Sequence, residues 1–170
     1  MTMFARTPIA LALVTLGLGF GNLARAQDAS AKIIDFGRYC QRLAAVSPTE
    51  QETSGAATVQ ADAVTHVETT KRIPCKIGEV FGFRVEYANL PKGRDYELRT
   101  EVYHPAIKQP NGEVLSRGVV KTTLKAGTRP DGTHTWSFLK GFEYELVRGT
   151  WTFTIYIDGR EVASKSFDVE

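Results

Sequence analysis

Three histidines, His66, His104 and His134, are the side chains best suited to proton transfer or metal binding near neutral pH. His104 and His134 are each in phase with the apolar side chains of an alternating segment, so we expect both at the rim of the apolar face. No two of the three histidines have the spacing of metal ligands, which favours rings that are satisfied by backbone groups. The catalytic alternative is a site shared by His104 and His134, with Glu101 or Glu143 as its carboxylate.

Other signs of catalysis are weak in this sequence. Glu143 and Glu145 lie two residues apart, a spacing that suits paired carboxylates. They alternate with apolar residues, so a solvated strand face is the favoured interpretation. The sequence contains no glycine-x-serine-x-glycine elbow, no phosphate-binding glycine loop and no paired metal-binding motif. We therefore predict a protein that is not an enzyme and carries no metal or cofactor.

Residues 1–26 have the organisation of a cleavable signal peptide. Arg6 follows the amino terminus, Ile9–Phe20 is a stretch of 12 uncharged, mostly apolar residues, and Ala24 and Ala26 provide the small residues of a cleavage site. About 20 apolar residues are needed to cross a bilayer, so this stretch is too short for an anchor. We expect cleavage after Ala26 and a periplasmic or secreted product that does not span the membrane.

Two cysteines, Cys40 and Cys75, remain after this cleavage. In an oxidising compartment a pair of cysteines is more often bridged than free. The loop that a bridge would close, about 36 residues, is worth roughly 4 kcal/mol in the chain-entropy treatment. We predict a Cys40–Cys75 disulfide, with two buried thiols as the alternative.

The 170 residues carry 21 basic and 19 acidic side chains, a formal charge of +2. Arg6 and Arg25 account for this excess, so residues 27–170 are neutral, and the lack of a basic run argues against a nucleic-acid partner. Residues 76–129 nevertheless hold 10 basic and 6 acidic side chains, whereas residues 130–170 hold 4 and 7. The length and the hydrophobic fraction of 42% are those of one globular domain.

Short alternating segments separated by turn residues fill the chain after the leader. Strands are expected over residues 32–40, 64–73, 81–87, 96–103, 114–124, 133–139, 151–157 and 160–169. Polar, aperiodic residues 44–60 are expected to form a long loop. We predict an all-β, antiparallel immunoglobulin-like β-sandwich, with a small closed β-barrel as the alternative. Residues 27–72 would supply the first strand, the loop and an edge strand, and residues 73–170 the core.

The last hairpin gives the clearest local prediction. Asp158 and Gly159 form a two-residue turn, which places Ile155 opposite Val162. A regular ladder from that turn would direct Phe167 away from the apolar face. We therefore predict a β-bulge between Val162 and Phe167.

The outward phases of several strands combine tyrosines with arginines. The candidate binding surface contains Tyr103, Tyr156, Arg84 and Arg99. Aromatic rings among guanidinium groups are enriched in recognition surfaces, although an ordinary mixed outer face of a sheet is the alternative.

The segment from Leu146 to Thr150 resembles the leucine-x-x-glycine-threonine corner of immunoglobulin-like sandwiches, with Trp151 next and Thr152 where a tyrosine is usual. Further motifs lie in order along the chain: Ile73-Pro74, Gly78-x-x-Phe81-Gly82, His104-Pro105, Phe142 to Trp151, and Phe167-Asp168-Val169. Together they resemble a family of mostly exported bacterial proteins, domain of unknown function 3859, over residues 33–169. This resemblance implies an exported immunoglobulin-like domain with no assigned activity and no catalytic residues.

These features predict a non-catalytic binding or scaffolding module of the cell envelope, whose partner is another protein or a glycan. One alternative is a periplasmic chaperone or inhibitor that pairs an edge strand with its client. A small hydrolase or metal enzyme that uses His104 and His134 is the other.

Overall fold

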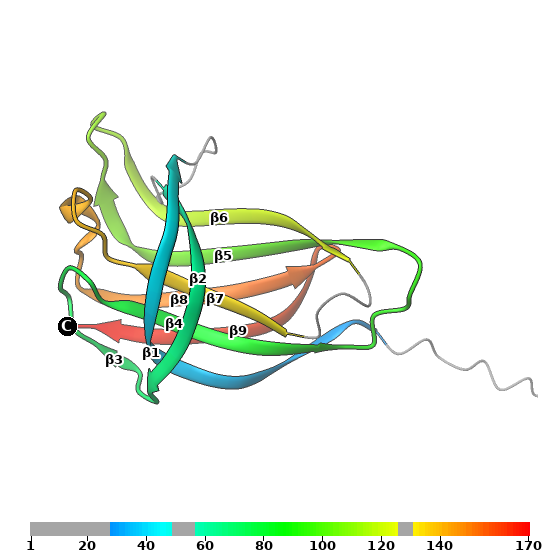
Figure 1. Cartoon of the computed structure of the whole chain (residues 1–170). Helices are drawn as coiled ribbons and strands as arrows, with labels where there is room; N and C mark the ends of the chain where they lie inside the picture. Colours follow the sequence, from blue (N-terminus) through cyan, green and yellow to red (C-terminus); the bar gives the residue numbers. More distant parts are fainter. Residues whose placement is uncertain (1–27, 49–56, 126–130) are drawn as a thin grey trace, which may run out of the picture.

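The computed structural model describes residues 28–48, 57–125 and 131–170 (Figure 1). The predicted leader, residues 1–26, lies outside these described residues. Within the described part of the chain, no helix has the length and apolar character needed to cross a membrane.

Nine strands of the described residues form two sheets. The four-stranded sheet has the order β2-β1-β4-β7, with β2 Ala57–Glu68, β1 Ser30–Pro48, β4 Val80–Ala88 and β7 Asp131–Ser137. The five-stranded sheet has the order β3-β9-β8-β5-β6, with β3 Arg72–Ile73, β9 Arg160–Val169, β8 Gly149–Ile157, β5 Asp95–Lys108 and β6 Val114–Lys125. Neighbouring strands are antiparallel except for β3 and β9, which are parallel. The predicted sandwich is confirmed, and the two sheets do not close into a barrel.

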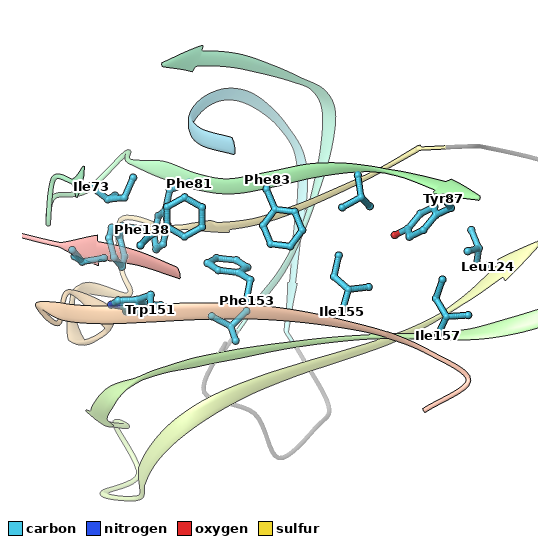
Figure 2. Close-up of a cluster of buried hydrophobic side chains, with 14 of the residues drawn as sticks. Ile73, Phe81, Phe83, Tyr87, Leu124, Phe138, Trp151, Phe153, Ile155 and Ile157 are labelled. Carbon is cyan, nitrogen blue, oxygen red and sulfur yellow. The ribbon is translucent and has the colours of Figure 1, made fainter. Parts of the chain in front are cut away.

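The core lies between the two sheets and is filled by alternate side chains of β4, β5 and β8 (Figure 2). Phe81 on β4 is completely buried, and its ring contacts Trp151 and Phe153 on β8 at centroid distances of 5.7 and 5.6 Å. Figure 2 shows smaller side chains, including Ile155, toward the far end of β8. The period-two alternation of β4 and β8 therefore directs alternate side chains of both strands into the core.

Trp151, at the start of β8, stands one residue before the position where a corner tyrosine is usual. The indole Nε1–H of Trp151 donates a hydrogen bond of 3.2 Å to the backbone carbonyl of Val147. A corner tyrosine makes the same kind of bond to the backbone a few residues upstream. Trp151 therefore ties the start of β8 to the segment that precedes it.

β1 is a long strand that serves two partners. Residues 30–39 pair with β4, and residues 38–48 pair with β2, which runs steeply across the other strands in Figure 1. The predicted loop over residues 44–60 is wrong for residues 44–48, which belong to β1, and for residues 57–60, which belong to β2, while residues 49–56 lie outside the described residues. Backbone hydrogen bonds hold a two-stranded ladder without any alternation of apolar side chains, so this hairpin had no sequence signature.

The expected strand over residues 64–73 is divided between the two sheets. Residues up to Glu68 belong to β2, whereas Arg72 and Ile73 form β3 beside β9. Both pieces are edge strands, as predicted for a segment that leads into Pro74.

The predicted β-bulge in the last hairpin is present. Tyr156 faces Glu161, but Ile155 faces Ala163 and not Val162 as predicted, because Val162 is itself the extra residue, at the first position of the predicted interval. Beyond it the facing is shifted by one residue, and Phe167 returns to the core, where it is completely buried.

Glu143 and Glu145 do not lie on a strand, which corrects the interpretation of a solvated strand face. They begin and end a short 3₁₀ turn between β7 and β8. The Glu143 carboxylate accepts a hydrogen bond of 3.0 Å from the backbone N–H of Gly141, whereas Glu145 is buried. A 3₁₀ helix has three residues per turn, so side chains two positions apart do not lie on one face.

The predicted Cys40–Cys75 disulfide is not formed, and both cysteines are free thiols. Cys40 is exposed on β1, opposite Thr65 of β2. Cys75 follows β3, is half-buried and packs against the core. The two side chains therefore have different surroundings, one at the hairpin surface and one against the sandwich.

Candidate functional site

His104 and His134 lie in separate surroundings and are both buried, deeper than the predicted rim. The His134 ring is hydrogen-bonded to the hydroxyls of Tyr87, at 2.7 Å, and Thr100, at 2.8 Å. His104 donates from Nδ1 to the backbone carbonyl of Pro105, and its ring lies 4.8 Å from that of Trp151. The expected backbone partner is thus correct for His104, whereas side chains satisfy His134.

The carboxylates that a histidine site would need are placed elsewhere. Glu101 binds Arg99 and Tyr103 on the outer face of the five-stranded sheet, and Glu143 lies in the 3₁₀ turn. The described residues contain no group of three or more histidine, cysteine, aspartate or glutamate side chains that could hold a metal ion. The geometry therefore gives no support to a shared acid–base or metal site.

Burial of His134 makes the stability of the sandwich depend on pH. Desolvation lowers the pKa of His134 from its usual 6.5 to about 4, so its neutral form is favoured in the folded state. As the pH falls from 7 to 4 the unfolded chain takes up this proton first, and stability is lost. We expect the free energy of unfolding to fall by about 3 kcal/mol more over this interval in the parent protein than in His134→Gln. Urea unfolding at both pH values measures the difference, and equal losses in the two proteins would contradict it.

The outer face of β5 and β8 carries three of the four residues of the predicted binding surface. The Arg99 guanidinium lies over the Tyr156 ring, 4.2 Å from its centroid, and its Nη1 is 2.7 Å from a carboxylate oxygen of Glu101. The Tyr103 hydroxyl donates a hydrogen bond of 2.5 Å to the other oxygen of Glu101. We call these four residues, Arg99, Glu101, Tyr103 and Tyr156, the outer patch.

Glu101 is the member of the outer patch that the sequence analysis did not place there. Glu101 is only 2% exposed although its side chain points to the outer face of a sheet. Burial on an outer face requires neighbouring side chains to cover the carboxylate, and both its oxygens are paired. An outward phase alone predicts exposure, so the sequence contained no signal for this burial.

Arg84 does not belong to the outer patch, because β4 lies in the other sheet. Its Nε donates a hydrogen bond of 2.8 Å to Asp35, whose other oxygen accepts one of 2.6 Å from the Tyr39 hydroxyl. Burial favours the protonated form of Asp35, but the hydrogen bonds from Arg84 and Tyr39 outweigh it and lower the pKa of Asp35. The predicted four-residue surface is thus divided between two faces of the molecule.

His66, on β2, contacts the group formed by Arg84, Asp35 and Tyr39. Its ring packs edge-on against Tyr39 at a centroid distance of 5.3 Å, and its Nε2 lies 3.0 Å from the carbonyl oxygen of Phe36. These contacts attach β2 to β1, so His66 has a structural role here.

A groove of about 510 Å³ lies where β1 bends past the ends of β4 and β7. Glu79 forms its buried floor, held by the Arg38 guanidinium at 2.6 Å and 3.1 Å. Gln41 spans to Ser137 across the groove with a hydrogen bond of 2.5 Å. The charged groups at its floor are paired with each other.

The fold and these surfaces define an immunoglobulin-like β-sandwich. The chain is similar to an immunoglobulin-like protein from Pseudomonas aeruginosa, with a TM-score of 0.62, 22% identity, and coverage of 86% of this chain and 99% of that chain. Residues 27–169 match the family described as a domain of unknown function (DUF3859), and the chain belongs to this family.

Two other comparisons add nothing to the function. A DNA-bound alkylpurine DNA glycosylase, AlkC, from Pseudomonas fluorescens matches with a TM-score of 0.39 and 13% identity, over 59% of this chain and 28% of that chain. No curated protein sequence matches the chain.

Proposed function

We propose that the protein is an exported, non-catalytic binding module of the cell envelope that recognises its partner with the outer patch. Residues 1–26 would be its leader, and residues 27–170 would form one mature domain outside the cytoplasm. The apolar stretch of residues 9–20 and the small residues before Gln27 support export. The family match from residue 27 onward is consistent with a leader that ends at Ala26.

Pre-organisation of the outer patch is the observation that carries this proposal. Arg99 is held between the ring of Tyr156 and the carboxylate of Glu101, so little of its side-chain freedom remains to be lost on binding. Tyr103 stands 40% exposed beside them, with its hydroxyl fixed by Glu101. Rigid tyrosines and arginines are the residues that most often dominate binding energy in recognition surfaces.

A role in binding rather than catalysis fits the rest of the molecule. His104 and His134 lie among core residues with partners of their own. The alternative of a hydrolase or metal enzyme would use His104 and His134, which share no hydrogen-bond partner among the contacts described above. An immunoglobulin-like fold in a family without an assigned activity also points to a non-enzymatic module.

Replacing Tyr103 by alanine tests the outer patch directly. The Tyr103 ring is 40% exposed, but its hydroxyl pairs one oxygen of the buried Glu101, so we expect the melting temperature to fall by about 5 °C while the fold is kept, together with loss of a specific partner from an envelope extract. Residues 27–170 would serve as the bait, and bound protein and carbohydrate would both be analysed. Arg84→Ala is the matched control, since it removes a charged side chain from the other sheet. Capture that survives Tyr103→Ala would contradict the proposal.

Pairing of β2 with a client is the second candidate function. β2 is an edge strand of 12 residues that contains no lysine, arginine or proline to guard it. Its ladder with β1 skips Asp62 and Val67, which marks bulges that shorten any continuous edge. Thr65→Lys would block capture by edge pairing and leave capture by the outer patch intact.

A further inference from the structure

We propose that the ligand of the outer patch is an anionic polysaccharide, which the patch binds together with Arg117 and Lys121 of β6. This inference rests on the proposed function and names the chemical class of its partner. The neighbouring residues on β6 lie directly opposite members of the outer patch: Arg117 faces Tyr103, Val119 faces Glu101, and Lys121 faces Arg99. Arg99, Arg117 and Lys121 place three positive charges around Glu101, and two further carboxylates lie farther out on the same face, Glu97 beyond Arg99 on β5 and Glu161 opposite Tyr156 on β9.

The pairing of Lys121 with Arg99 is unfavourable within the isolated protein. Like charges directly opposite each other on neighbouring strands destabilise a sheet. Arg99 has its partner in Glu101, but Lys121 forms no ion pair with any residue that the structure describes, and β6 contains no acidic residue. A negative group bound between Lys121 and Arg99 would relieve this repulsion. Local rules of this kind are most often broken at functional sites.

The geometry favours a long ligand with repeated negative charges. Arg117 and Lys121 are four residues apart on the same face of β6, which corresponds to about 13 Å along the strand. Side-chain hydroxyls continue the surface across β8 and β9, where Thr152 is 2.9 Å from Ser166 and Thr154 is 3.2 Å from Ser164. The exposed hydroxyls among them, those of Ser164 and Ser166, can donate to or accept from the hydroxyls of a sugar chain, whereas Thr154 is buried.

The composition of this face favours a sugar chain over an acidic protein. Stable protein interfaces have a buried apolar centre that is depleted in charge. Here the central residue of the rows between Arg117 and Lys121 is the charged Glu101, which lies between Val119 and Thr154 of the neighbouring strands, with cations before and after this row. Tyr103 offers a single exposed ring, which suits packing against one sugar unit.

Affinity electrophoresis of the purified protein tests this proposal. The native gel would contain polygalacturonate, with neutral dextran and poly-glutamate in parallel gels. We expect retardation in polygalacturonate alone, and at least a tenfold weaker apparent affinity for Arg117→Glu and Lys121→Glu. Lys92→Glu, in the exposed turn after β4, is the control with the same change in net charge and should bind as the parent protein does. Circular dichroism melting would confirm that each variant is folded.

Three results would overturn the inference. The first is no retardation of the parent protein in polygalacturonate. The second is retardation by poly-glutamate that is equal or stronger. The third is an equal weakening of binding by Lys92→Glu, which would mean that the attraction of charge is unspecific. None of these results contradicts the proposed function, which depends on Tyr103-dependent capture from an envelope extract. If the Tyr103 variant loses that capture and the parent protein does not bind polygalacturonate, the outer patch remains the proposed binding surface, and the anionic polysaccharide is rejected as its ligand.

Discussion

Phe81→Ala is expected to lower the free energy of unfolding by about 3–5 kcal/mol, since it opens a cavity at the centre of the core. The Phe81 ring is completely buried, and it contacts four aromatic rings at centroid distances of 5.5–5.7 Å. Three of these contacts are edge-on, at 74–83°, the arrangement that aromatic pairs favour. Urea unfolding followed by tryptophan fluorescence measures the change.

Phe142→Ala provides the matched control for this cavity. Phe142 precedes the 3₁₀ turn and is only half-buried, so its loss should cost about 1 kcal/mol. A loss below about 1.5 kcal/mol for Phe81→Ala would mean that the neighbouring rings collapse into the space, and the aromatic cluster would not be the centre of stability.

Gly82→Ala is expected to destabilise the protein by about 3 kcal/mol, because β4 and β7 approach closely at this position. A Cβ on residue 82 would overlap the carbonyl oxygen of His134 and lie 2.8 Å from the Cα of Thr135. The backbone φ of +154° is also one that residues with side chains rarely adopt. Chemical unfolding measures the loss, and hydrogen exchange should show faster opening of the β4–β7 ladder.

Gly93→Ala separates the two causes. Gly93 also has a positive φ, +93°, but nothing lies within 4 Å of the position of its Cβ. We expect a cost of about 1 kcal/mol from the backbone alone. An equal fall in the free energy of unfolding for Gly82→Ala and Gly93→Ala would show that the close approach of β4 and β7 does not add to the cost of the substitution.

Sequence patterning predicted the parts of the fold in which side chains decide the pairing. Alternation in β4 and β8 reflects one buried face and one solvated face, so it predicted both strands and the bulge at Val162. The outer part of the β1–β2 hairpin, residues 41–48 and 57–63, escaped prediction because its residues are mostly small or polar, and backbone hydrogen bonds define it. The bridge between Cys40 and Cys75 was predicted from compartment and number alone, which contain no information on distance.

The candidate site was predictable in its residue types and not in its assembly. Tyr103, Tyr156 and Arg99 share an outward phase, and the pairing of β5 with β8 brings them together. Arg84 has the same phase, but a strand pattern does not tell which sheet a strand joins. The burial of Glu101 depends on three neighbouring strands at once, and no local pattern contains that arrangement.

The position of β9 has a consequence for the order of folding. β9 follows every other described strand in the chain, yet it lies between β3 and β8, and Phe167 packs against Phe81 and Phe153. The aromatic cluster therefore cannot close until residues 160–169 have been synthesised, and β3 has no neighbour in its sheet before then. Contacts so distant in sequence make folding slow. An emerging chain thus lacks the Phe167 ring of its core until translation has passed β9.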